Sequence, residues 1–192
     1  MPSMPRACFC SWNAPRESVL QLQCLAHRMS QIEQLQKRLE AMKEHAWDVI
    51  GSDQQLTDTA ERIESIPGFA QLSAIRLIAE LAVLADDMSP QQWVAHAGLG
   101  PRPLESGSSQ RPPRRISKQG NARIRSALFM PALVATQHEP HVAAYYQQLL
   151  ARGKPKMVAL TAVMRRLLHA LWGMQHHKQE WDGNKFYPLK AA

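Results

Sequence analysis

A Pro67-Gly68 pair separates two stretches of apolar residues at helical spacing, and this pattern strongly limits the possible local folds. Proline fixes its own backbone angle, and glycine reaches a positive φ without steric cost, so the pair favours a tight turn between helices. Small Ala74 would let the second helix pack closely. The apolar positions are Ile63 and Ile66 before the turn, and Leu72, Ile75, Ile78 and Leu81 after it. We therefore predict a helix-hairpin-helix over about residues 54–85.

Such a hairpin would leave main-chain N–H groups free where its second helix begins, and free N–H groups suit a phosphate. Pro67, Gly68 and Phe69 are therefore candidate contacts to a nucleic-acid backbone. The alternative is an ordinary Pro-Gly turn between two core helices, and this segment alone favours neither interpretation.

A long helix is predicted over residues 17–50, because apolar residues recur there with heptad spacing. Arg28 interrupts the series, and the intervening residues are mostly Gln, Glu, Lys and Arg. The heptad positions are Leu25, Ile32, Leu35, Leu39, Met42, Ala46 and Val49. This narrow seam could pack on the chain's own domain, but its polar other faces favour a coiled coil with a second copy.

The rest of the chain also predicts helices and no strand, so the expected fold class is all-α. Residues 1–16 are rich in Pro and Cys and are expected to be a disordered head, whereas residues 54–174 form the helical domain. Within it, Ser89-Pro90-Gln91-Gln92 is typical of a capping box at a helix start. Later helices are expected over about 121–136, 140–150 and 156–174, followed by a polar, aperiodic tail over 175–192.

The net charge of +7 is distributed very unevenly along the chain. Residues 1–105 carry −4 and residues 106–192 carry +11, and no acidic residue occurs from Pro140 to Gln179. Such a one-sided basic segment favours a polyanionic partner and indicates a nucleic acid, either DNA or structured RNA. A membrane surface fits less well, because no helix combines a basic face with a wide aromatic one, and no apolar run could span a bilayer. A merely soluble basic domain is the plain alternative.

Residues 98–120 interrupt the helical pattern with four prolines and form a long basic loop. Between Arg102 and Arg125 there are seven Arg or Lys residues and a single acid. Ser106 precedes Gly107 within this loop, and a serine hydroxyl among guanidinium groups could attack a phosphorus atom. A Ser-Gly-Ser-Ser run is, however, far more often a flexible polar loop, and Ser108 and Ser109 are the other candidate hydroxyls.

The residues expected to contact DNA are those of the hairpin turn together with Gly107, Asn121 and the basic side chains of the second half. The basic set comprises Arg102, Arg114, Arg115, Lys118, Arg125, Lys154 and Arg165. We expect no metal site: the histidines are scattered, and the three cysteines lack the paired spacing of zinc ligands.

Several motifs resemble one family of bacterial proteins in sequence and in order, over about residues 25–175. They are Ile66-Pro67-Gly68-Phe69, the run from Trp93 to Arg102 ahead of Ser106-Gly107, the run from Arg115 to Asn121, and the run from Ala162 to Leu168. The chain resembles the C-terminal domain of insertion-sequence transposases that join a RuvC-like DEDD domain to a serine-bearing domain. Piv-type invertases belong to the same group.

The resemblance implies that Ser106 is the DNA-attacking nucleophile and that recombination passes through a covalent protein–DNA intermediate. It also implies a structured guide RNA, an oligomer assembled through the coiled coil, and an active site shared with a DEDD domain. Mg²⁺ is then expected only in that missing domain, so this chain needs no cofactor of its own. The implied location is the bacterial cytoplasm, at the nucleoid.

Three departures from the family pattern matter. No RuvC-like domain is expected here, so the chain is interpreted as a truncated copy, and a separate DEDD-bearing relative is a candidate partner. Ala70 stands where the family usually has a second hairpin glycine, and Arg111-Pro112-Pro113-Arg114 replaces a commoner glycine-containing stretch. The alternative function is an inactive DNA-binding and dimerisation module, or an inhibitor of a full-length relative.

Overall fold

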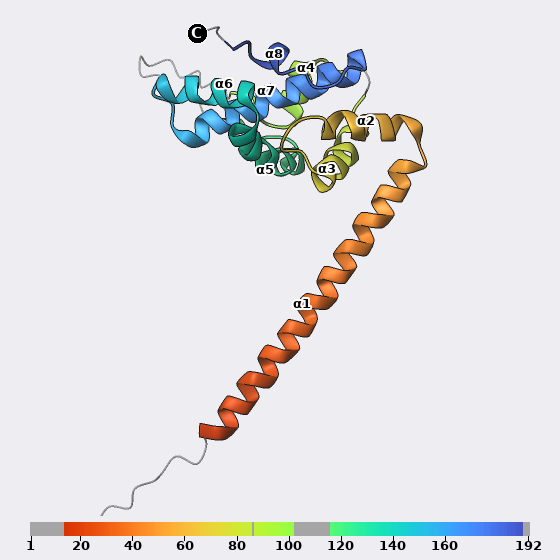
Figure 1. Cartoon of the computed structure of the whole chain (residues 1–192), viewed down its shortest axis with the longest axis vertical. Helices are drawn as coiled ribbons and strands as arrows, with labels where there is room; N and C mark the ends of the chain where they lie inside the picture. Colours follow the sequence, from red (N-terminus) through yellow and green to blue (C-terminus); the bar gives the residue numbers. More distant parts are fainter. Residues whose placement is uncertain (1–13, 86, 102–115, 190–192) are drawn as a thin grey trace, which may run out of the picture. The chain divides into compact units, whose positions relative to one another are not determined.

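The computed structural model describes residues 14–85, 87–101 and 116–189, with side chains described from residue 21 onward. Every regular element among these residues is a helix, and the only extended pairing among them is an isolated bridge between Pro101 and Ile116 (Figure 1). The predicted all-α class is thus confirmed. The chain divides into two compact units, residues 1–45 and residues 46–192.

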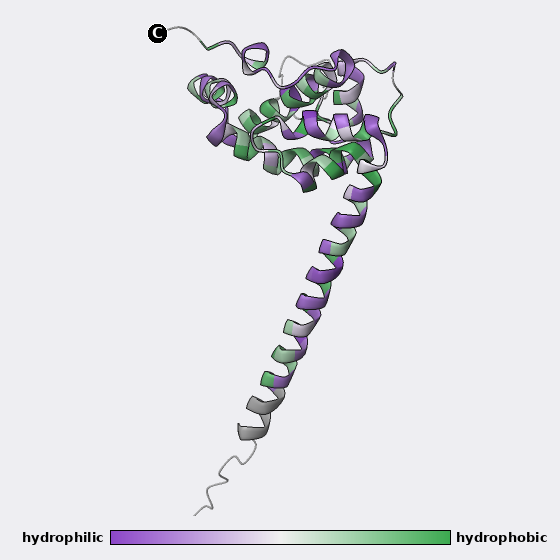
Figure 2. Cartoon of the chain, turned by 45° about the vertical axis from the view of Figure 1, so that its right-hand side comes forward, coloured by the Kyte–Doolittle hydropathy of each residue, from purple (hydrophilic) through white to green (hydrophobic). Residues whose placement is uncertain are grey.

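Helix α1 (Ala14–Gly51) begins three residues before its predicted start, so Ala14 to Arg16 are helical and do not belong to a disordered head. Its apolar residues are spaced along an otherwise hydrophilic helix (Figure 2). Large apolar side chains of this helix are about half exposed or more: Leu22, Leu25, Met29, Ile32, Leu35, Leu39 and Met42. No described residue of residues 1–45 covers them.

Helices α2 (Gln54–Glu64) and α3 (Gln71–Leu81) lie in the predicted hairpin region. Asp53 caps α2 through its side chain, whereas Ala70 gives α3 no side-chain cap. Gly68 has the expected positive φ, 103°, and a Cβ there would lie 2.9 Å from the carbonyl oxygen of Pro131. The turn thus packs closely against α5 (Ala122–His138).

Helix α7 (Lys156–His177) is the central helix of the remaining part of the domain. It packs against α4 (Pro90–His96), α5 and α6 (Pro140–Ala151) (Figure 1). The capping box predicted at Ser89 and Gln92 is present, and Asn121 caps α5. The central position of α7 follows from its sequence. Its buried residues repeat at helical spacing: Ala159, Leu160, Val163, Met164, Leu167, Leu168, Leu171 and Met174.

The segment after α7 differs from the polar, aperiodic tail that the sequence predicts. It folds back as the short helix α8 (Gly183–Phe186), and the side chain of Phe186 is buried in the core. The Arg166 guanidinium lies 4.7 Å from the ring centre of Tyr145 and 5.3 Å from that of Phe186. These cation–π contacts and the buried ring anchor the segment to the domain, and the isolated aromatic residues of the tail are the sequence signal for it.

None of the helices in the described parts of the chain is long and apolar enough to cross a lipid bilayer.

Candidate nucleic-acid interface

Residues 98–101 and 116–121 pair with each other and form what we call the stem, which joins the two ends of the basic loop. The N–H of Ser117 donates to the carbonyl of Gly100 at 2.9 Å, and the N–H of Lys118 donates to that of Gly98 at 3.2 Å. The N–H of Asn121 donates to the carbonyl of His96 at 2.7 Å, which ties the stem to the last residue of α4. The chain therefore enters and leaves residues 102–115 at one place, beside α4 and the start of α5.

Two glycines let the stem approach this closely. Gly98 has a φ of 66°, and a Cβ there would lie 2.5 Å from the carbonyl oxygen of Gln119. Gly120 has a φ of 117°, and a Cβ there would overlap the carbonyl oxygen of His96. Any other residue at either position would meet both a strained backbone and a main-chain clash.

Two hollows lie beside the stem and share Leu99, Ile116 and Thr161 in their walls. The first, about 530 Å³, also contains Lys118 and Arg165. The second, about 470 Å³, contains instead two basic residues, Arg76 and Arg125. Four basic side chains, from α3, the stem, α5 and α7, thus line the two hollows beside the stem.

Among these four, Arg125 also supports the fold. Its guanidinium donates to the carbonyl of Ala97 at 2.9 Å, next to the point where Gly98 begins the stem. Part of its donor capacity is therefore used inside the domain, so Arg125 is a positioning residue of the stem as well as a predicted DNA contact.

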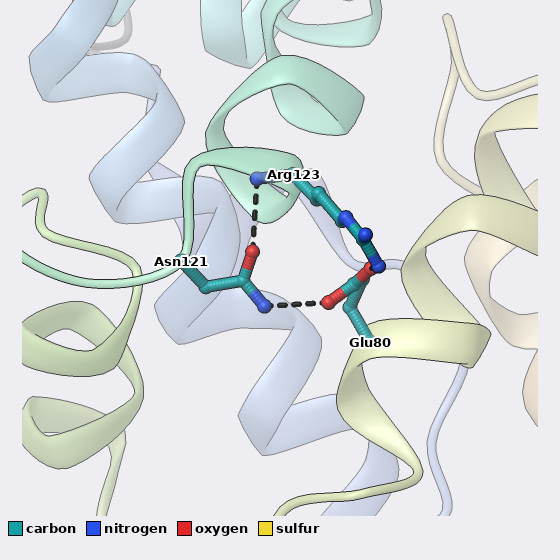
Figure 3. A network of polar contacts seen from close by, with 3 residues as sticks. All are labelled: Glu80, Asn121 and Arg123. Carbon is teal, nitrogen blue, oxygen red and sulfur yellow. Dashed lines mark hydrogen bonds and ion pairs between the residues drawn. The ribbon is translucent and has the colours of Figure 1, made fainter.

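Asn121, another predicted DNA contact, takes part in a polar network with Glu80 and Arg123 (Figure 3). Its side-chain amide donates to Glu80 at 2.5 Å, and its carbonyl oxygen accepts the N–H of Arg123 at 2.9 Å. The hydrogen bond from Asn121, with the nearby Arg123, holds the pKa of the Glu80 carboxyl below its usual value. Asn121 therefore joins α3 to the start of α5.

The remaining predicted basic contacts among the described residues are free to meet a ligand. The side chains of Lys118, Lys154 and Arg165 are exposed. Lys118 adopts the left-handed conformation, with φ 54°, which is uncommon for a residue with a side chain. Lys118 and Arg165 line the same hollow, whereas Lys154 lies in the turn before α7.

The hairpin turn exposes fewer of the predicted nucleic-acid contacts than the sequence suggests. The Phe69 side chain is buried in the core, and its N–H donates to the carbonyl of Ile66 at 3.1 Å. Gly68 faces α5 at close range, and only Pro67 of the three predicted residues is exposed. Because the ring of Phe69 is buried and its N–H is hydrogen-bonded within the turn, Phe69 contributes to packing in this conformation.

The loop residues that carry the chemical prediction lie outside the described residues. They are Arg102, Ser106, Gly107, Arg114 and Arg115. Their roles stay predictions, and the structure contributes the position of the stem at which their segment starts and ends.

Basic side chains also influence His169, on the face of α7 near the tail. Partial burial lowers the pKa of His169, and the neighbouring Arg165 and Arg166 lower it further. Within the described part of the chain, no three His, Cys, Asp or Glu side chains are grouped as metal ligands would be.

Sequence comparison adds an independent observation about this region. Residues 60–147 match the Transposase IS116/IS110/IS902 family. The matching transposase-family segment contains α3, α4, the whole basic loop with its stem, and α5.

Individual proteins are also similar in sequence to this chain. The pilin gene-inverting protein of Moraxella bovis is 27% identical over 137 residues, which are 71% of this chain and 42% of that protein. An uncharacterized 44.8 kDa protein of insertion element IS116 from Streptomyces clavuligerus is 30% identical over 122 residues, 64% of this chain and 30% of that protein. A putative transposase of Sinorhizobium fredii is 37% identical over 90 residues, 43% of this chain and 22% of that protein.

The chain spans less than half of the length of these curated relatives.

Sequence reasoning missed two residues of the site, Arg76 and Glu80. Both lie on α3, and their polar side chains are not part of the apolar spacing that predicts this helix. Glu80 is joined to a residue 41 positions away, and a contact of that separation leaves no local pattern in the sequence. The signal that could have singled out Glu80 is that it is the one acidic residue in a largely apolar helix.

Proposed function

We propose that this chain acts in DNA transposition or site-specific inversion as the part that carries out strand exchange, with Ser106 as nucleophile. The observation behind the proposal is that Arg76, Lys118, Arg125 and Arg165 line the two hollows beside the stem, where the segment that contains Ser106 starts and ends. The match of residues 60–147 to a transposase family supports it.

The proposed reaction is a transfer of a phosphodiester bond to the protein. The Ser106 oxygen forms a bond to a DNA phosphorus atom, and the bond from that phosphorus to one deoxyribose oxygen breaks. The serine proton passes, by way of solvent, to the departing deoxyribose oxygen. Basic side chains near the stem would stabilise the charge that builds on the phosphate oxygens. The phosphoserine link keeps the energy of the bond until a second strand displaces the serine.

Further parts of the proposal concern other molecules. We propose that a DEDD domain, outside this sequence, supplies the Mg²⁺ site, and that a structured RNA guides the choice of DNA. The setting would be the bacterial cytoplasm, at the nucleoid. The contacts described above for the stem and the two hollows do not involve a DEDD domain or an RNA.

DNA binding itself is tested by its salt dependence. Replacing Arg165 with alanine should weaken binding to a labelled duplex similarly for different sequences, and should reduce the slope of log K against log salt by about 1. Lys118→Ala should do the same, because each change removes one phosphate contact. Fluorescence anisotropy over a series of salt concentrations measures both slopes.

The matched control is Lys37→Ala, on α1 in the acidic half of the chain, which should leave the slope unchanged. Slopes that are equal in wild type, Arg165→Ala and Lys118→Ala would remove the stem from the DNA interface.

We also propose that α1 pairs with α1 of a second copy. The heptad side chains Leu35 and Leu39 are 62% and 47% exposed, and an apolar stripe of this length is seldom left to water. Leu35→Glu should raise the dissociation constant of the dimer by about 100-fold, because a charge replaces a core leucine in both helices. Sedimentation equilibrium measures the effect.

Gln34→Glu is the control, since it places the same charge one residue away on the outer face of the heptad. Wild-type protein that stays monomeric at every concentration would contradict the pairing.

A further inference from the structure

The first hollow beside the stem is a groove with apolar walls. Its apolar lining consists of the stem residues Leu99, Pro101 and Ile116 together with Met157, Val158 and Ala162 from the first turns of α7. Its volume of about 530 Å³ falls in the range of sites that enclose small molecules or parts of larger ones. Met157 and Val158 remain 60% and 52% exposed, so this apolar surface lacks a partner within the described chain.

The charges around the groove are all of one sign. Lys118 and Arg165 belong to its lining, and no acidic residue occurs among the described lining residues. Exposed Lys154 and Lys156 flank Pro155, at the end where α7 begins. A ligand that fits must therefore combine an apolar, compact part with adjacent negative charge.

The start of α7 adds to this positive field. Pro155 caps the helix without a side-chain hydrogen bond, so the first-turn N–H groups have no side-chain cap. Among the described residues, the N–H of Ala159 is the first in the helix with a main-chain partner, the carbonyl of Pro155. Since Pro155, Met157 and Val158 all line the groove, its rim includes the positive end of a helix of 22 residues.

We propose that this groove receives one unpaired base of single-stranded DNA, while the phosphates on either side lie against Lys118 and Arg165. This inference rests on the proposed function and deepens it. A nucleotide has the required combination of a flat, largely apolar base and adjacent negative charges, whereas the bases of an intact duplex are stacked and paired and cannot enter.

The walls favour DNA over RNA. Thr161 provides the only side-chain hydroxyl among the described lining residues, and no lining side chain carries an amide or carboxylate. A ribose 2′-hydroxyl placed against the apolar side chains of Met157 and Val158 would lose hydrogen bonds to water there, which carries a cost in free energy. The apolar walls would instead receive the methyl group of a thymine without such a cost.

The test compares wild-type protein with Val158→Gln, using fluorescence anisotropy with labelled oligodeoxythymidine and with a duplex of the same length. Because the substitution makes one wall polar without changing charge, it should weaken single-strand binding by about fivefold and leave duplex binding unchanged. Val83→Gln, at a valine 83% exposed after the end of α3, is the matched control and should change neither. Both valines lie on the surface, so both variants should fold.

A second measurement locates the base directly. Oligodeoxythymidine carrying one 5-iodouracil is irradiated in the complex, and the cross-linked peptides are identified by mass spectrometry. The expected cross-link lies between Pro155 and Arg165.

The inference is overturned if Val158→Gln binds the single strand as tightly as wild type does, if both probes weaken equally, or if cross-links form only elsewhere. Tighter binding of oligouridine than of oligodeoxythymidine would overturn the choice of DNA. In each of these cases duplex binding by wild type leaves the proposed function standing, whereas a wild-type chain that binds neither probe removes both.

Discussion

Alanine at Ser106 is expected to abolish a covalent protein–DNA adduct and to leave DNA affinity unchanged. The serine oxygen is the atom that bonds to phosphorus in the proposed reaction, and alanine has no atom to replace it. The phosphate contacts come from other side chains, so binding should persist. The measurement uses labelled duplex DNA from either side of this reading frame, with and without a DEDD-bearing relative. The mixture is denatured and resolved on a gel, where an adduct migrates more slowly.

Ser108→Ala and Ser109→Ala are the matched controls, because each removes a hydroxyl from the same run of residues. Both should keep the adduct. An adduct that persists in Ser106→Ala and disappears in one of the controls would move the nucleophile to that residue. Salt-sensitive binding with no adduct under any condition would instead identify a DNA-binding module without catalysis.

Gly120→Ala is expected to destabilise the domain by about 2–4 kcal/mol, a loss typical of strained backbone combined with a steric clash. The φ of 117° at this position is unfavourable for any residue with a Cβ, and the new atom would overlap the carbonyl oxygen of His96. The hydrogen bond from the N–H of Asn121 to that same carbonyl would be lost as the chain moves apart. Urea unfolding followed by circular dichroism at the helical band measures the change.

Gly173→Ala is the control for this change. Gly173 lies inside α7 with no neighbouring atom within 4 Å of an added Cβ, so alanine there should stabilise the helix by about 1 kcal/mol. A Gly120→Ala protein as stable as wild type would show that the stem is not needed for the fold. If the prediction holds, the adduct of the wild-type chain should also diminish in this variant, since the stem positions both ends of the loop.

The local sequence pattern was sufficient to predict the helices and the positions of several helix ends. Ser89 and Gln92 form the capping box that their spacing predicts, and α6 begins at Pro140, as expected for a proline in the first turn. These features depend on residues within four positions of one another, so the sequence displays them directly. The basic character of residues 106–192 was equally predictable, because net charge follows from the amino-acid sequence alone.

Contacts between distant residues decided which predicted site residues stay available to a ligand. Asn121 and Phe69 both fit a nucleic-acid contact by type, yet Asn121 bonds to Glu80 and Phe69 is buried in the core. Arg125 is shared between the carbonyl of Ala97 and the second hollow. A residue type states what a side chain can bind, but its neighbours in space determine what is left over for a ligand.

By itself, the sequence determined that this protein is helical, that its second half is strongly basic, and that its loop begins and ends near prolines and glycines. Only the tertiary structure decided that Gly98 and Gly120 close a stem, that four basic residues from separate elements line the two hollows beside it, and that the tail packs through Phe186. The physical reason is the separation along the chain of the residues that interact. Helix formation and net charge arise from neighbours along the chain, whereas the stem, the groove and the docked tail depend on packing between segments whose separation no local period records.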